Sequence, residues 1–135
     1  MNKNGVEQTR FNSSIFLTFS GNCKRALTFY QNCFGGQLHF EMFDKVVETF
    51  PKQFVISGCL RSDKIIIRGS DLTYDQGRII GNSMAIYVQC SSSLERRTIK
   101  NKLLIGKNSE IPIDDSGSKL IEIIDQFQVR WILGL

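Results

Sequence analysis

The chain of 135 residues has the length of one ordinary domain, and its formal net charge is +4. Hydrophobic residues make up 41% of it and charged residues 22%, a globular balance that excludes a disordered or fibrous chain. Its apolar runs are far shorter than the roughly 20 residues that cross a bilayer, and its first residues carry no apolar signal core. We therefore expect a soluble, cytoplasmic protein without a membrane partner.

Cysteine and histidine usage narrows the possible sites. The four cysteines form no Cys-x-x-Cys pair, and His39 is the single histidine. This pattern excludes a zinc knuckle, a dithiol redox motif and any site that needs two histidines. We expect reduced cysteines that mostly serve as small core residues. His39 lies on the polar phase of its strand, which favours a structural or solvent-exposed residue.

Apolar periodicity in the first half predicts the order β-α-β-β-β. The helix is expected to end at Gly35-Gly36, where a left-handed cap needs no Cβ. Residues 44–52 are ambiguous, with one helical turn as an alternative to a loop. The expected elements are a flexible leader over 1–13, a strand over 15–19, a helix of about three turns around 26–34, and strands over 37–43, 54–60 and 64–68.

The same order recurs after a predicted loop over 69–81, which indicates an internal repeat. The expected elements of the second half are a strand over 83–89, a helix over 94–105, and strands over 111–113, 119–124 and 129–133. We therefore predict a single α+β domain over 14–135, built from βαβββ modules at about 14–71 and 82–135. Such modules form a curved, mostly antiparallel eight-stranded sheet with both helices on its outer face, which leaves the concave face for a ligand.

Three segments also carry a resemblance to a known family. They are the run from Phe16 to Cys23 with Phe29-Tyr30 and Phe34-Gly35-Gly36, then Gly69-Ser70-Asp71, and finally the run from Asp125 to Trp131. In order and spacing they resemble PhnB-like proteins of the glyoxalase and bleomycin-resistance group, the vicinal oxygen chelate superfamily. The resemblance covers nearly the whole chain from Ser14 onward. It implies paired βαβββ modules and a homodimer, which would also close the open edges of the sheet.

The resemblance further implies where a metal would be held. Metal-dependent members carry ligands at positions that are Ile15, Ser83 and Ile132 here, and a histidine that PhnB-like members often keep maps to Ser57. Isoleucine has no lone pair and serine is a poor ligand for a divalent ion, so we expect neither a metal nor another cofactor. The family's glycine near the chain end is replaced by Gln128.

Four more residues of the predicted strands are candidates for lining the concavity: Cys59, Arg68, Glu122 and Arg130. A reactive Cys59 would need a neighbouring cation, and an inert half-buried thiol is the alternative. Arg68 and Glu122 are charges inside apolar strands, so each faces either the cavity or the wet edge of the sheet. Strand alternation puts Arg130 on one face with Ile132 and turns Trp131 into the core.

These observations favour a metal-free, PhnB-like protein that binds a small molecule in its concave sheet. One alternative is a glyoxalase-type lyase or isomerase with Glu122 as general base and Arg68 or Arg130 stabilising an enolate-like anion. The other is a structural dimer whose cavity is filled by phenylalanine and isoleucine side chains. The basic second helix has no interleaved aromatic residues, which favours a solvated face and no nucleic-acid partner.

Overall fold

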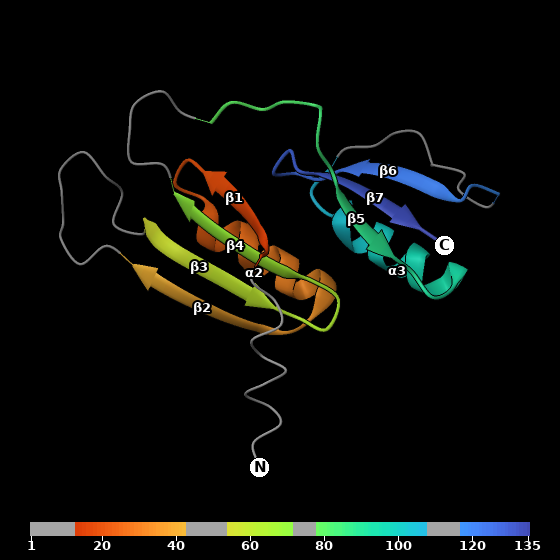
Figure 1. Cartoon of the computed structure of the whole chain (residues 1–135), viewed down its shortest axis with the longest axis horizontal. Coiled ribbons are helices and arrows are strands. Elements are labelled where there is room, and N and C mark those ends of the chain that lie inside the picture. Colours follow the sequence, from red (N-terminus) through yellow and green to blue (C-terminus); the bar gives the residue numbers. More distant parts are fainter. Residues whose placement is uncertain (1–12, 43–53, 72–77, 108–116) are drawn as a thin grey trace, which may run out of the picture.

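The computed structural model describes residues 13–42, 54–71, 78–107 and 117–135. Over these residues the chain is a mixed α+β structure, as the sequence predicts, and it consists of two open sheets and two helices (Figure 1). Both helices lie behind the sheets in Figure 1, so each sheet has a covered face and a face turned away from the helices. Residues 1–12 of the expected leader over 1–13 and the ambiguous stretch over 44–52 lie outside the described residues.

The first module has the predicted order. Its elements are β1 (Ile15–Phe19), α2 (Cys23–Phe34), β2 (Gln37–Met42), β3 (Val55–Arg61) and β4 (Ile66–Asp71). The strands lie in the order β1-β4-β3-β2, with β1 parallel to β4 and the other pairs antiparallel. The apolar stripe of α2 is buried against this sheet and includes Cys23, Ala26 and Leu27, which is the periodicity read from the sequence.

Strand β4 corrects the predicted loop, because it continues to Asp71 where a loop from Gly69 was expected. Gly69 pairs with Leu17 on one side and Gly58 on the other. A Cβ at Gly69 would stand 3.1 Å from the Cys23 sulfur, so the glycine lets the strand pass close beneath α2. The glycine thus marks close packing, although in the sequence it looks like a turn.

The second module contains β5 (Ile86–Gln89), α3 (Ser93–Leu103), β6 (Leu120–Ile124) and β7 (Arg130–Gly134). Within the described residues these strands form a separate sheet in the order β5-β7-β6, with β5 parallel and β6 antiparallel to β7. The hydrogen bonding therefore gives sheets of four and three strands, not one sheet of eight. The remaining predicted strand, over 111–113, lies outside the described residues. Strand β5 begins three residues later than predicted, at Ile86.

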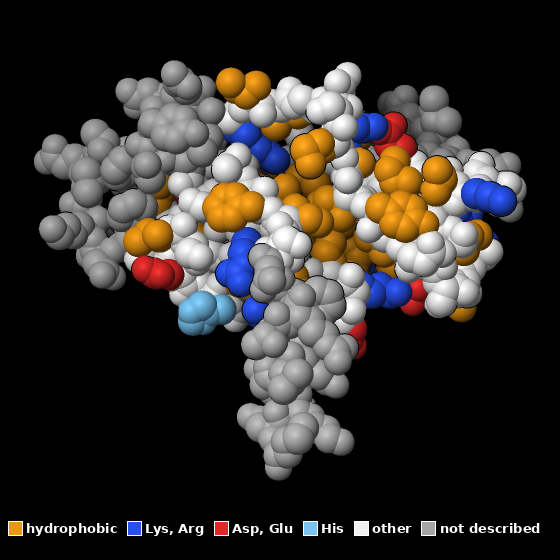
Figure 2. All heavy atoms as spheres, viewed as in Figure 1, with side chains coloured by type: hydrophobic (Ala, Val, Ile, Leu, Met, Phe, Trp, Pro, Cys, Tyr) orange, Lys and Arg blue, Asp and Glu red, His pale blue; other side chains and the backbone are white. Residues whose placement is uncertain are grey.

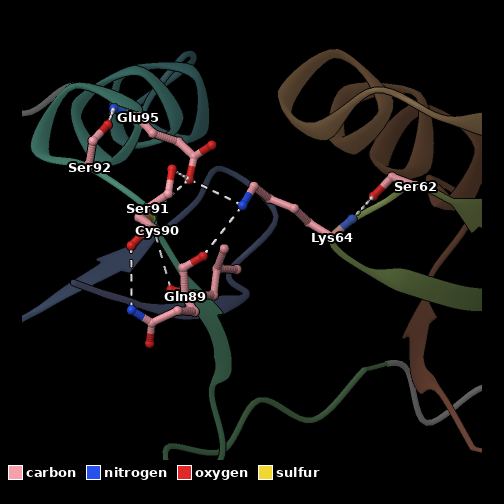
Figure 3. Close-up of polar contacts among 8 residues, drawn as sticks. Ser62, Lys64, Gln89, Cys90, Ser91, Ser92 and Glu95 are labelled. Atoms are coloured by element: carbon pink, nitrogen blue, oxygen red, sulfur yellow. Dashed lines mark hydrogen bonds and ion pairs between the residues drawn. The ribbon is translucent and has the colours of Figure 1, made fainter.

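A polar cluster joins the modules at the start of α3 (Figure 3). Lys64, in the turn between β3 and β4, forms an ion pair of 3.1 Å with Glu95 and donates to the carbonyl oxygen of Gln89. Glu95 also accepts from the backbone N–H of Ser91, while the Ser92 hydroxyl accepts from the Glu95 N–H. The bond from the Ser91 N–H and the contact with Lys64 lower the pKa of Glu95, and the Ser92 bond caps the helix, so the cluster is explained by the fold.

One hydrophobic core runs beneath both sheets. Trp131 of β7 is fully buried, as predicted, and its ring lies 5.4 Å from Tyr30 and 5.2 Å from Phe34, both on α2. Helix α2 therefore packs on both modules. Of the helices that the structure describes, neither is long and apolar enough to cross a membrane.

Two buried carboxylates organise the segments that resemble the PhnB-like family. Asp125 accepts hydrogen bonds from the Tyr30 hydroxyl at 2.6 Å, from the Trp131 indole at 2.8 Å and from the N–H groups of Phe127 and Val129. Asp71, at the end of β4, accepts from three backbone N–H groups of residues 21, 23 and 55. The segments that identify the fold are thus explained by buried hydrogen bonding.

Candidate functional site

The strand register defines a helix-free face, the side of each sheet turned away from α2 and α3. On the first sheet Phe16, Arg68, Cys59 and His39 form one row of direct cross-strand neighbours on this face. On the second sheet Tyr87, Ile132 and Glu122 form a corresponding row. Phe16 is 57% exposed and Tyr87 is 52% exposed. Figure 2 views this side and shows hydrophobic side chains gathered where the sheets meet, with Lys and Arg side chains around them.

Most of the predicted site residues lie on the helix-free face. Ser57, Cys59 and Arg68 are on the first sheet, and Glu122, Arg130 and Ile132 are on the second.

Two predicted positions differ from this arrangement. Ile15 shares its face with Ile67 and packs against the core, so it points to the side opposite Ser57. Ser83 is exposed and precedes β5 without belonging to it. Ile15 and Ser57 therefore lie on opposite faces of their sheet, because the alternation of β1 turns Ile15 toward the core.

A cleft of about 270 Å³ lies between the facing edges of β1 and β5. Its walls come from β1, from the segment before β5 and from the turn that leads into β7. Among the residues that the structure describes, its lining is mostly apolar and has no acidic member: Ile15, Phe16, Leu17, Thr18, Arg78, Ile79, Ile80, Gly81, Met84, Ala85, Ile86, Gln128, Val129 and Arg130. A concave apolar pocket with a few polar groups is the usual form of a small-molecule site.

Arg130 stands at one side of this cleft and is held by several acceptors. Its Nε donates to Glu122 at 2.7 Å, and its Nη2 also pairs with that carboxylate. Its Nη1 donates to the carbonyl oxygens of Asn82 at 2.6 Å and Met84 at 3.2 Å. Arg130 therefore ties residues 78–85, which we call the connector, to β6 and β7.

Arg78, at the start of the connector, stands where the modules meet. Its guanidinium carbon lies 4.9 Å from the ring centre of Phe19 at the end of β1, and its Nη1 donates to the carbonyl oxygen of Phe127 at 2.6 Å. Burial lowers the pKa of Arg78, while the nearby Tyr30 and Asp125 act in the opposite direction. The cleft therefore contains a partly desolvated cation.

The hypothesis of a glyoxalase-type enzyme receives no support from Glu122. Its side chain is 47% exposed and its Oε2 is paired with Arg130, whereas a general base is expected in a protected position. Cys59 is only half-buried and has Arg68 and His39 as cross-strand neighbours. Within the described ranges, no group of three or more His, Cys, Asp or Glu side chains could hold a metal ion.

The connector is a part of the candidate site that the sequence pattern does not predict. Arg78, Ile79, Ile80 and Met84 all line the cleft, although their segment resembles an ordinary loop. The available signal was its composition, because two adjacent isoleucines and a methionine are unusual in a solvated loop. Gln128 also lines the cleft, and its φ of 66° lies in the left-handed region that favours glycine. This conformation explains why the family resemblance places a glycine at that position.

Comparison with solved structures places this geometry in a known fold. The PhnB protein from Bacillus cereus, to which a 3-demethylubiquinone-9 3-methyltransferase activity is provisionally ascribed, superposes with a TM-score of 0.74 at 20% identity, over 93% of this chain and 99% of its own. The chain shares its fold with a PhnB protein. A Pseudomonas aeruginosa protein gives a TM-score of 0.71 at 23% identity, over 92% of this chain and 96% of its own.

A third solved structure agrees with this result. An Arabidopsis thaliana gene product superposes with a TM-score of 0.58 at 13% identity, over 93% of this chain and 98% of its own. The sequence matches no protein-family model and no curated protein sequence. These likenesses establish the fold, so any function must be argued from the cleft and its residues.

Proposed function

We propose that this protein binds a small organic molecule in the cleft between β1 and β5 without the help of a metal. The cleft itself carries the proposal. It has about 270 Å³ of space, apolar walls from β1 and the connector, and polar groups from Arg78, Gln128 and Arg130. This combination suits a ligand with an apolar body and one polar end. An open cleft of this size also weighs against the alternative of a cavity filled by side chains.

A neutral fluorescent probe, N-phenyl-1-naphthylamine, tests whether the cleft binds. We expect saturable fluorescence enhancement at one probe per chain. Ala85→Trp places an indole in the cleft that Ala85 lines, and it should weaken probe binding by about tenfold or more, since even one or two lost apolar contacts cost about 1.4 kcal/mol.

The matched control is Asn101→Trp, which adds the same side chain at an exposed position of α3 away from the cleft. It should bind the probe like the unchanged protein. Absence of saturable binding, or equal affinity for both tryptophan variants, would contradict the proposal. Metal analysis of the purified protein tests the claim that binding needs no metal. One divalent ion per chain would overturn that claim.

The helix-free face supports a second element of the proposal, that two copies pair through it. It presents Phe16, Tyr87, Leu120 and Ile124 with exposures of 57%, 52%, 59% and 42%. Several large apolar side chains exposed on one face are typical of a protein interface. Within the described sheets, β1, β2, β5 and β6 are also edge strands with unpaired backbone groups. A second copy would cover both features.

Sedimentation velocity on two leucine variants tests the pairing. Leu120→Lys puts a charge on the helix-free face and should convert a dimer to a monomer at micromolar concentration. Leu94→Lys makes the same change on α3, where Leu94 is 69% exposed, and should leave the dimer intact. A monomeric unchanged protein would contradict the proposed pairing.

A further inference from the structure

The charge of the cleft says more about the ligand than its shape does. Within the described parts of the chain, its lining includes Arg78 and Arg130 and no aspartate or glutamate. A cation in an apolar, partly desolvated site is costly unless an anion is near it. The two arginines differ in how many of their hydrogen-bond donors already have acceptors within the protein.

Most of the hydrogen-bond donors of Arg130 already have acceptors within the protein. Its ion pair with Glu122 and its contacts to the carbonyl oxygens of Asn82 and Met84 occupy all three of its nitrogens. We therefore assign it a supporting role, because it holds the connector in place and adds positive potential at the edge of the cleft.

Arg78 is the arginine with donors to spare. A guanidinium has five N–H donors, and within the part of the chain that the structure describes Arg78 makes one hydrogen bond, to the carbonyl oxygen of Phe127. Its plane is steadied by the ring of Phe19. The carboxylate that interacts electrostatically with Arg78 is that of Asp125, and it already accepts hydrogen bonds from four donors of the core. The remaining N–H groups are therefore available to a ligand in the cleft.

We propose that the cleft selects a small organic anion, a monocarboxylate with an apolar body, whose charged end pairs with Arg78. The apolar body would lie along β1 and the connector, against side chains such as Phe16 and Ile80. A guanidinium binds a carboxylate through two parallel hydrogen bonds, which fixes orientation as well as charge. This inference rests on the proposed function, since it names the class of ligand for the same cleft.

Displacement of N-phenyl-1-naphthylamine by octanoate and by octanamide provides the test. The two competitors have the same chain length and differ in their charged or neutral end. Octanoate should bind at least about tenfold more tightly, because its carboxylate forms charge-assisted hydrogen bonds with the guanidinium that a neutral amide does not. Arg78→Gln should remove this preference and leave octanamide binding within about twofold of the unchanged protein, which also shows that the variant folds.

Two further variants complete the experiment. Arg97→Gln removes the same charge from an exposed position of α3 and should keep the octanoate preference. Arg78→Lys retains the positive charge but lacks the planar guanidinium, so it should keep part of the preference for octanoate. Equal displacement by both competitors, or a preference that survives Arg78→Gln, would overturn the inference while leaving the proposed function intact. Failure of the naphthylamine probe to bind at all would instead overturn the proposed function.

Discussion

The covered side and the helix-free face of the sheets differ in what their residues do. The covered side holds the segments that resemble the PhnB-like family, and they act through Asp71, Asp125 and the glycines that allow close packing. The helix-free face and the adjoining cleft hold Ile132 and Ser57 where the resemblance implies metal ligands. The buried polar anchors therefore belong to the covered side, and the residues proposed to bind a ligand belong to the other side and the cleft.

The largest expected effect is the loss of a buried anchor. Asp125→Ala leaves four donors in the core without their acceptor, among them the Tyr30 hydroxyl and the Trp131 indole. Each buried donor that loses its partner costs about 1 to 3 kcal/mol, so the free energy of unfolding should fall by at least about 3 kcal/mol. Urea denaturation followed by tryptophan fluorescence measures this change.

Asp63→Ala provides the control for that variant. Asp63 is exposed in the turn between β3 and β4, so the same substitution should change the free energy of unfolding by no more than about 0.5 kcal/mol. Similar losses for the two aspartates would show that Asp125 does not anchor the core and would remove the contrast between the two sides.

The glycine pair after α2 tests the framework in a second way. Gly36 has a φ of 103°, and a Cβ there would stand 2.1 Å from the carbonyl oxygen of Arg61. Gly35 also has a positive φ, 75°, but nothing lies within 4 Å of its added Cβ. Both alanine variants should be strained, and Gly36→Ala should lose about 2 kcal/mol more because the backbone must shift. Equal losses in thermal unfolding would contradict the close approach.

Much of this framework can be predicted from the sequence, because buried positions follow the period of their element. The apolar stripe of α2 and the inward turn of Trp131 are visible in the spacing of residues alone. The end of β4 cannot be predicted in this way. Gly69 allows close packing beneath Cys23, but a glycine in a sequence is equally typical of a turn.

The candidate site is less predictable from sequence. Strand alternation correctly puts Arg130 and Ile132 on one face, but it cannot show that Ile15 and Ser57 lie on opposite sides of their sheet. That fact depends on the register between strands that are far apart in the chain. Arg78 escapes prediction because its role comes from Phe19 and Phe127, which approach it only after the modules have packed.

The covered side should also be the more sensitive to alkaline pH. Burial, reinforced by Asp71, raises the pKa of Cys23 to about 12, and burial with Asp125 does the same for Cys33. An unfolded thiol has a pKa of about 8.5. Above that pH the unfolded chain loses protons that the folded chain retains, so stability falls as pH rises toward 12, by up to about 1.4 kcal/mol per pH unit for each thiol.

Chemical denaturation at a series of pH values checks this prediction. Cys23→Ala removes one thiol, so its stability should decline less steeply than that of the unchanged protein between about pH 9 and 11. The slopes should coincide between about pH 6 and 8, where the thiols are protonated in both states. A Cys23→Ala variant with an unaltered alkaline slope would argue against a buried, protonated thiol at this position.

The smallest expected effect belongs to the helix-free face. Glu122→Gln weakens an ion pair whose side chains are 47% and 25% exposed, and such pairs contribute at most about 1 kcal/mol. Arg130→Gln should cost more, because it also loses the carbonyl oxygens of Asn82 and Met84. The difference between the two variants in urea denaturation therefore measures how firmly the connector is held. If Glu122→Gln proved as damaging as Asp125→Ala, the helix-free face would be part of the framework and not a surface free to vary.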